Sequence, residues 1–256
     1  MQTLLPVGAD RLWVEDSETQ GPAVVLLHEG IADSRMWDGM WPDLIADFRV
    51  VRYDVRGFGR SPAPTQQYHL VDDLLAVLDA LDIRRATLVG CSIGGGTALG
   101  AAVSAPDRVA SLVLLAPGIP GYPWPDEPEL DAELDRLFEA EDEDGILAAR
   151  LREWAAAGSE PLIVDMMRSA VRAWEYEGTF QQKPEPVFDR LGEVDIPAAL
   201  MVGDLDRPPL IACAEAAAER LPQCELIRMP GVDHLPSMRE PAWITTVVTK
   251  YAAAYA

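Results

Sequence analysis

Two hydrophobic patterns alternate along the chain. Residues 23–27 are all apolar and lie between Gly-Pro and His-Glu-Gly, which is typical of a strand buried on both faces of a sheet. Residues 70–81 place leucines three and four positions apart, which predicts a helix with one apolar face. The same patterns predict further strands at residues 11–15, 50–53, 86–89, 109–115, 198–202 and 225–229, and further helices at residues 36–48, 93–104, 210–221 and 242–253. Alternating strands and helices need crossover connections, so we expect an α/β fold with a mainly parallel sheet.

The alternation is interrupted between residues 118 and 190. This stretch contains proline-rich turns and helical segments with scattered Trp and Met, but no comparable apolar run. We therefore predict one α/β core domain, formed by residues 1–117 and 191–256, with a helical cap inserted at residues 118–190.

Composition narrows the class of protein. The 256 residues include 42 Asp and Glu against 21 Lys and Arg, a formal net charge of −21, and 49% are hydrophobic. This apolar content predicts a folded core, and the negative charge repels phosphate backbones and anionic lipid, so we expect neither nucleic-acid nor membrane binding. The three cysteines are too scattered for a disulfide framework or a zinc site. No signal peptide or membrane-spanning run is recognisable, and we expect a cytoplasmic monomer or homodimer.

A candidate nucleophile follows the strand predicted at residues 86–89. Gly90-Cys91-Ser92-Ile93-Gly94 fits the pattern G-x-S-x-G and leads directly into a predicted helix. A sharp strand-to-helix turn exposes the Ser92 hydroxyl at the carboxyl edge of the sheet, beside a helix N-terminus that favours developing negative charge. Cys91 is a rival nucleophile, but we expect its side chain to point away from Ser92 into the packed turn. A glycine-rich turn with a structural serine is the alternative interpretation.

A serine hydroxyl needs a base to remove its proton, and the chain has three histidines. His234 lies in the loop after the last predicted strand. His69 begins a surface helix, and His28 faces a neighbouring loop. We therefore predict His234 as the base.

The carboxylate that orients this base is expected to follow a strand at the same edge of the sheet. Asp204 and Asp206 both follow the strand at residues 198–202, and Asp206, further out, can reach across to His234. Asp204 lies in the tight turn, where we expect it to bind backbone amides, and the side chain of Asp233 diverges from that of its neighbour His234. We predict Asp206 as the partner of His234, in the chain order expected for this kind of nucleophile.

These residues together resemble the α/β-hydrolase superfamily. His28-Glu29-Gly30, followed by Trp37, looks like the oxyanion loop of the family. Residues 53–61, Tyr-Asp-Val-Arg-Gly-Phe-Gly-Arg-Ser, look like its Y-D-x-R-G-x-G-x-S loop, in which Asp54 and Arg56 match structural residues of relatives. Within the superfamily the chain is most similar to small cap-bearing esterases and lactonases of the 3-oxoadipate enol-lactonase type, which share these motifs with C–C hydrolases and cofactor-free perhydrolases.

The resemblance implies an α/β-hydrolase fold with a mostly parallel eight-stranded sheet flanked by helices. It implies catalysis by Ser92, His234 and Asp206 in two-step acyl transfer through an acyl-enzyme. The backbone N–H groups of Gly30 and Ile93 would form the oxyanion hole. No metal and no organic cofactor is implied.

One residue departs from the family pattern, because Glu29 stands where relatives carry Gly or another small residue. A carboxylate about 6 Å from a developing oxyanion would oppose it by about 3 kcal/mol at an effective dielectric constant of about 20. We therefore expect Glu29 to point away, to pair with Arg35 or Arg56, or to be protonated. The bolder hypothesis is that Glu29 contacts a polar or cationic group of the substrate.

The function that we predict is hydrolysis of a carboxylic ester or lactone of a small, mainly apolar substrate. Trp124, Met166 and Trp174 of the predicted cap are candidate substrate contacts, with cap core as the alternative for each. C–C bond hydrolysis or perhydrolysis by the same triad is a second hypothesis. A non-catalytic small-molecule receptor on the same fold is a third.

Overall fold

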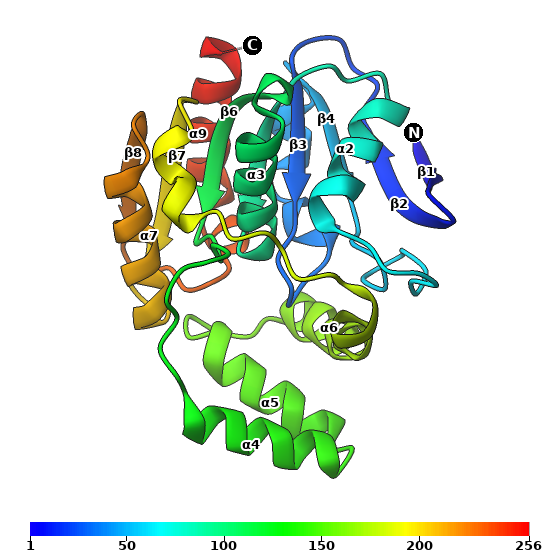
Figure 1. The fold of residues 1–256 in the computed structure, drawn as a ribbon, viewed down its shortest axis with the longest axis vertical. Helices are drawn as coiled ribbons and strands as arrows, with labels where there is room; N and C mark the ends of the chain where they lie inside the picture. Colours follow the sequence, from blue (N-terminus) through cyan, green and yellow to red (C-terminus); the bar gives the residue numbers. More distant parts are fainter. Residues whose placement is uncertain (256) are drawn as a thin grey trace.

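A single eight-stranded sheet forms the centre of the computed structural model, which describes residues 1–255 (Figure 1). The strands follow the order β1-β2-β4-β3-β5-β6-β7-β8. β2 pairs antiparallel with β1 and β4, and the other pairs are parallel, which confirms the predicted fold class. The strands are β1 (Gln2–Val7), β2 (Asp10–Asp16), β3 (Ala23–Leu27), β4 (Arg49–Tyr53), β5 (Ala86–Cys91), β6 (Val109–Leu115), β7 (Ala198–Gly203) and β8 (Cys224–Met229).

Helices cover both faces of this sheet, and a further group of helices lies beyond the carboxyl ends of the central strands (Figure 1). The α-helices are α1 (Trp41–Leu44), α2 (Leu70–Ala80), α3 (Ile93–Ser104), α4 (Pro128–Glu139), α5 (Glu143–Trp154), α6 (Pro161–Phe180), α7 (Pro208–Arg220), α8 (Pro236–Arg239) and α9 (Pro241–Ala254). Short 3-10 helices are η1 (Ser34–Trp37), η2 (Pro106–Arg108) and η3 (Phe188–Glu193).

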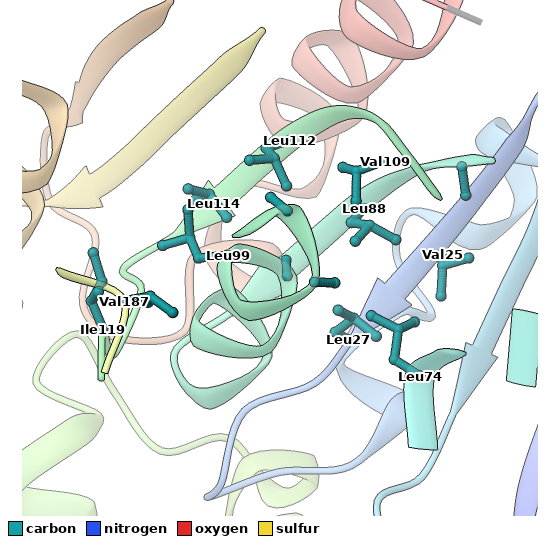
Figure 2. Close-up of a cluster of buried hydrophobic side chains, with 14 of the residues drawn as sticks. Val25, Leu27, Leu74, Leu88, Leu99, Val109, Leu112, Leu114, Ile119 and Val187 are labelled. Carbon is teal, nitrogen blue, oxygen red and sulfur yellow. The ribbon is translucent and has the colours of Figure 1, made fainter. Parts of the chain in front are cut away.

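The core is divided by the sheet into two apolar layers. Successive side chains of a strand point to opposite faces, so β3 needs apolar residues at every position. Val25 and Leu27 pack with Leu99 of α3 on one face, as Figure 2 shows. Val24 and Leu26 belong to the cluster on the other face, which includes residues of α9. The central strand is thereby held from both sides, and its carboxyl end has a fixed position.

One local prediction was wrong, and one strand was missed. Residues 36–48 do not form one helix, because η1 ends at Trp37 and the one-turn helix α1 begins afresh with Pro42 in its first turn. Proline has no N–H for an intrahelical hydrogen bond, so it favours a helix start. The strand β1 was not predicted, since its apolar positions are interrupted by Pro6 and only partly buried. Proline is tolerated there because β1 is an edge strand.

The helices α4, α5 and α6 follow β6 in the sequence and pack on one another. In Figure 1 they lie beyond the carboxyl ends of the central strands, and residues 181–187 lead from them back to the core. The division of the chain into core and cap stays a prediction. Within residues 1–255, no helix is long and apolar enough to cross a bilayer.

Candidate active site

Ser92 occupies a strained turn between β5 and α3. Its φ of 48° and ψ of −114° lie in a region that side-chain-bearing residues rarely adopt. The turn is also tight, since a Cβ built on Gly90 would lie 2.3 Å from the carbonyl oxygen of Gly94, and one built on Gly94 would lie 2.2 Å from that of Leu27. The glycines of the G-x-S-x-G pattern therefore make the turn possible, and the Ser92 side chain projects from the carboxyl end of β5.

His234 is held by a buried carboxylate. Its Nδ1 lies 2.9 Å from Oδ2 and 3.1 Å from Oδ1 of Asp206, which follows β7. Burial, the largest single effect, lowers the pKa of His234. The charge of Asp206 and its hydrogen bond, together with the charges of Glu29 and Asp233, raise that pKa, and the net direction is upward. The Arg207 N–H also donates to Oδ1 at 2.7 Å, which fixes the carboxylate. With Nδ1 bound to Asp206, Nε2 is the nitrogen that remains for proton transfer.

The two aspartates that sequence reasoning set aside bind other groups. Asp204 accepts a hydrogen bond of 2.6 Å from the N–H of Gly231, which ties the β7 turn to the loop of His234. Asp233 accepts from the N–H of Ala157 at 2.9 Å and pairs with Arg239 at 2.8 Å. Neither carboxylate is hydrogen bonded to the His234 ring within residues 1–255. Asp206 alone of the three candidates therefore orients the imidazole.

The segments of Ser92 and His234 meet at one edge of the sheet. Sγ of Cys91, the residue before Ser92, lies 3.9 Å from the backbone carbonyl oxygen of His234. The described part of the chain shows no hydrogen bond between Oγ of Ser92 and Nε2 of His234. Such bonds are often long in a substrate-free site and tighten when substrate binds.

Gly30 and Ile93 approach each other across the site. A Cβ on Gly30 would lie 3.5 Å from Cδ1 of Ile93, so the early loop touches the first residue of α3. The N–H of a first helical residue has no intrahelical acceptor and points out of the helix end. The indole Nε1–H of Trp174 donates to the Gly30 carbonyl at 2.7 Å, which fixes the early loop. Two backbone segments suited to an oxyanion hole are thus adjacent.

Glu29 is completely buried, with an exposed fraction of 0%, and its carboxyl group faces the base. Oε2 lies 4.0 Å from Nε2 of His234 and accepts from the Cys91 thiol at 3.3 Å, while Oε1 has no hydrogen-bond partner among the described residues. Burial raises the pKa of Glu29 to about 7, the charges of Asp206 and Asp233 add to this rise, and His234 and Cys91 oppose it. The expected alternative of a protonated carboxyl group therefore agrees with its surroundings.

The arginines proposed as partners of Glu29 bind other carboxylates. Arg35 pairs with Asp33 at 2.7 Å and with Asp165 of α6 at 2.6 Å. Arg56 is buried between Asp10 and Asp73. The expected pairing with Arg35 or Arg56 is thus not what the structure shows, because these arginines are already neutralised.

Cys91 is a poor nucleophile in this environment. It is fully buried, and burial, followed by the nearby Glu29 carboxyl, raises the pKa of its thiol well above its ordinary value. A thiol with a raised pKa is hardly ionised at neutral pH, and the thiolate is the reactive form. Cys91 is therefore disfavoured as the nucleophile.

Trp154, at the end of α5, covers the imidazole. Its ring centroid lies 4.4 Å from that of His234, with the planes tilted by 42°. The Arg207 guanidinium lies 4.6 Å from the centroid of the same indole and pairs with Glu153 at 2.5 Å. Sequence reasoning did not place Trp154 at the base, since the contact depends on how α5 docks on a loop far away in the sequence.

The other residues of the predicted cap that the sequence singled out lie in different environments. Trp174 binds the Gly30 carbonyl, as described above. Met166 is buried in the same apolar cluster as Met36 of η1. Trp124 is 40% exposed and packs edge-on against Tyr122, with ring centroids 4.8 Å apart. The structure therefore brings Trp174 to the site and leaves Trp124 at the surface.

A groove of about 590 Å³ runs along α3, and its lining includes Ile93, the residue that follows Ser92, but neither Ser92 nor His234. Ile93 and Gly118 lie at its inner end, and the N-terminal turn of α2, which begins after His69, forms one wall. No cluster of three or more His, Cys, Asp or Glu side chains within residues 1–255 could hold a metal ion.

Comparisons with known proteins identify the fold family of the chain. Residues 22–156 match the family model described as the alpha/beta hydrolase fold. The chain is 42% identical over 107 residues to a 2-hydroxymuconate semialdehyde hydrolase of Pseudomonas, a match that covers 40% of this chain and 37% of that protein. The first curated relatives are matched over only 37% to 40% of their own length.

Solved structures match over almost the entire chain. A thermophilic esterase from Thermogutta terrifontis has a TM-score of 0.81 at 25% identity, with 100% of this chain and 99% of that chain covered. The enol-lactonase from Burkholderia xenovorans has a TM-score of 0.79 at 22% identity, with 98% and 100% covered. At this identity the second match is evidence for the fold alone.

Proposed function

The chain belongs to the α/β-hydrolase fold family, and we propose on this premise that it hydrolyses a carboxylic ester or lactone of a small, mainly apolar substrate. Ser92 is the nucleophile in this proposal, His234 the general base and Asp206 the residue that orients it. The observation that carries the proposal is the buried 2.9 Å contact between His234 and Asp206, at the sheet edge from which the strained Ser92 projects.

The proposed reaction proceeds in two acyl-transfer steps. Ser92 Oγ attacks the carbonyl carbon while Nε2 of His234 takes its proton, and Asp206 stabilises the resulting imidazolium. The N–H groups of Gly30 and Ile93 donate to the oxyanion, which is where preorganised donors contribute most to rate. His234 then protonates the leaving alcohol, and a water activated by the same base hydrolyses the acyl-enzyme.

Glu29 serves this reaction in its neutral form, which predominates below a pH of about 7. An ionised carboxylate 4.0 Å from Nε2 would stabilise an imidazolium by about 4 kcal/mol at an effective dielectric constant of about 20. A histidine that is already protonated cannot accept the proton of Ser92. The burial that raises the pKa of Glu29 to about 7 therefore helps to keep His234 available as a base. In this proposal the side chain acts on the imidazole and does not touch substrate.

C–C bond hydrolysis by the same three residues is the second candidate. The observation that favours it is the 42% identity with a 2-hydroxymuconate semialdehyde hydrolase over 107 residues. Rates of the purified protein on simple esters and on vinylogous diketones separate the two reactions. An ester hydrolase shows turnover of the first class and none of the second.

Labelling with a fluorophosphonate probe tests the nucleophile. We expect the parent protein to be labelled and the Ser92→Ala variant to be unlabelled. The matched control is Cys91→Ala, which removes the rival nucleophile and is expected to label like the parent. Equal labelling of the parent and Ser92→Ala would show that the assignment is wrong. A parent that is neither labelled nor active would favour a non-catalytic receptor.

A further inference from the structure

The groove beside Ser92 is built along one face of α3, and we call it the α3 groove. Its volume of about 590 Å³ lies within the range of small-molecule sites in proteins. Residues 181–187, which we call the strap, form the wall opposite α3 together with the first turn of α2. The floor is a set of residues spaced three and four apart on α3: Ile93, Gly96, Thr97, Gly100, Val103 and Ser104.

The inner end of the α3 groove lies at the nucleophile. Ile93 directly follows Ser92, and a Cβ built on Gly118 would lie 3.7 Å from Ser92 Oγ. The helix rises by about 16 Å between Ile93 and Ser104, at about 1.5 Å per residue. The α3 groove therefore runs from the neighbours of Ser92 to the far end of α3.

The floor of the α3 groove is apolar although it contains two hydroxyl groups. Thr97 Oγ1 donates to the carbonyl of Ile93 at 2.8 Å, and Ser104 Oγ donates to that of Gly100 at 2.8 Å. Both hydroxyl protons are thus used within the helix, so they need no partner from a ligand. The rest of the floor is hydrocarbon, which favours burial of an alkyl group, while the polar lining residues Asp72, Gln182 and Glu185 belong to the walls.

The strap is anchored at its two ends. The Gln182 N–H donates to the Tyr68 carbonyl at 2.9 Å, and the N–H of Val187 donates to the Pro120 carbonyl at 2.9 Å. Pro184 and Pro186 lie between these anchors and restrict the backbone. Figure 1 shows the strap crossing in front of α3, and Figure 2 shows Val187 and Ile119 beside the same helix. The wall is therefore preformed and follows the length of α3, which suits an extended chain.

The position of His234 decides which part of an ester enters the α3 groove. His234 must protonate the leaving alcohol, so the alcohol lies on the His234 side of Ser92. Neither His234 nor Trp154, which covers it, lines the α3 groove. The acyl part is therefore the part on the groove side.

Charge restricts the acyl part further. Asp72 and Glu185 lie at the rim of the α3 groove, and Arg190, the arginine beside them, pairs with Glu193 at 2.7 Å. The chain as a whole carries a formal charge of −21. An acyl chain that bears its own anionic group is repelled by this field.

We propose that the α3 groove is an acyl-chain site, and that the substrate is an uncharged ester or lactone whose acyl part carries an unbranched alkyl chain. This inference rests on the proposed function, because it takes Ser92 as the nucleophile.

A chain-length series of p-nitrophenyl esters, from acetate through butyrate and octanoate to dodecanoate, tests the inference. Each buried methylene contributes at most about 0.8 kcal/mol, or about fourfold in kcat/KM. We expect the parent to prefer octanoate over acetate by about tenfold or more, since part of the chain is buried. Val71→Trp fills the α3 groove opposite Gly100 and is expected to lower kcat/KM for octanoate relative to acetate by about tenfold, which removes this preference.

Two further variants keep the test decisive if Val71→Trp fails to fold. Val103→Trp fills the outer end of the α3 groove and is expected to lower the ratio of kcat/KM for dodecanoate to kcat/KM for butyrate. Ala80→Trp adds the same side chain at an exposed position of α2 that does not line the groove, and is expected to behave like the parent.

The possible outcomes distinguish a failure of the acyl-chain site from a failure of the proposed function. Acetate turnover without any chain-length preference would overturn the acyl-chain site alone, and so would groove variants that lower the rate on every ester equally. No turnover of any ester, with Ser92 unlabelled by a fluorophosphonate, would instead overturn the proposed function and the acyl-chain site with it.

Discussion

The two sides of Ser92 are built from different kinds of contact. On the His234 side, directional hydrogen bonds join distant segments: the indole of Trp174 donates to the Gly30 carbonyl at 2.7 Å, and the N–H of Ala157 donates to Asp233 at 2.9 Å. On the groove side, glycines and aliphatic residues of α3 face a proline-containing strap. In the proposed reaction the two sides meet different requirements. Proton transfer depends on fixed distances, whereas binding of an alkyl chain depends only on apolar space. Substitutions on the two sides are therefore expected to affect kcat/KM for short and long esters differently.

The largest expected effect comes from Asp206→Asn, on the His234 side. An amide can hold His234 in the wrong tautomer and cannot stabilise an imidazolium, so we expect kcat/KM to fall by about 10⁴-fold. The loss is expected to be the same for acetate and octanoate esters, because the acyl chain lies on the other side of Ser92. Steady-state kinetics on both esters measure it.

Asp204→Asn is the matched control for this variant. Asp204 binds the N–H of Gly231 and not the imidazole, so its amide variant is expected to keep the activity of the parent within about tenfold. If Asp206→Asn lost no more activity than this control, Asp206 would not be the orienting residue.

An effect of intermediate size is expected from Glu29→Gln, and it depends on pH. The pKa of Glu29 rises from an ordinary 4.5 to about 7 through burial, with Asp206 and Asp233 adding to the rise and His234 and Cys91 opposing it. The unfolded chain releases this proton near pH 4.5 and the folded chain near pH 7. The parent therefore loses stability as pH rises through this window, by about 3 kcal/mol in total.

Glu29→Gln does not titrate and escapes this loss. Its free energy of unfolding is expected to equal that of the parent near pH 4.5 and to exceed it by about 3 kcal/mol above pH 7, as measured by urea unfolding at several pH values. Glu160→Gln, at an exposed glutamate paired with Arg239, is the control and is expected to show no gain. A constant difference between Glu29→Gln and the parent over this range would contradict the raised pKa.

The smallest expected effect comes from Trp174→Phe, which removes the hydrogen bond to the Gly30 carbonyl and retains most of the ring. The loss of one such bond costs about 1 kcal/mol, so we expect about a fivefold decrease in kcat/KM through a less ordered early loop. Trp124→Phe, at the exposed tryptophan, is the control and is expected to have no effect. Equal kinetics for the two variants would show that the Gly30 contact does not order the oxyanion donors.

Sequence patterns predicted the central strands of the sheet better than the edge strand β1 and the short helices η1 and α1. The runs that became β3, β5 and β7 were recognisable because strands buried on both faces need uninterrupted apolar residues. The edge strand β1 has no such requirement and went unnoticed. The break between η1 and α1 depends on the single residue Pro42, which the helical spacing around it conceals.

The candidate site was predictable where chemistry is tied to a local turn. The glycine spacing of the G-x-S-x-G pattern specifies the strand-to-helix turn that carries Ser92. The structure also places Asp206 and His234 together, and their catalytic role stays a prediction. The contact of Trp154 with His234 was not predictable, because it joins segments that only docking of α5 brings together. Glu29 was recognisable as unusual, but its surroundings depend on Cys91 and His234, which are distant in the sequence.

The anchoring of the strap at its two ends has a consequence for how such an enzyme diversifies. The residues between the anchors, including Pro184 and Pro186, border the α3 groove, yet the hydrogen bonds that hold Ser92, Asp206 and His234 lie elsewhere. Replacements in this short stretch can therefore alter which molecules are accepted without disturbing the reaction itself. Descendants of this protein are therefore able to change their substrates while they keep the same reaction.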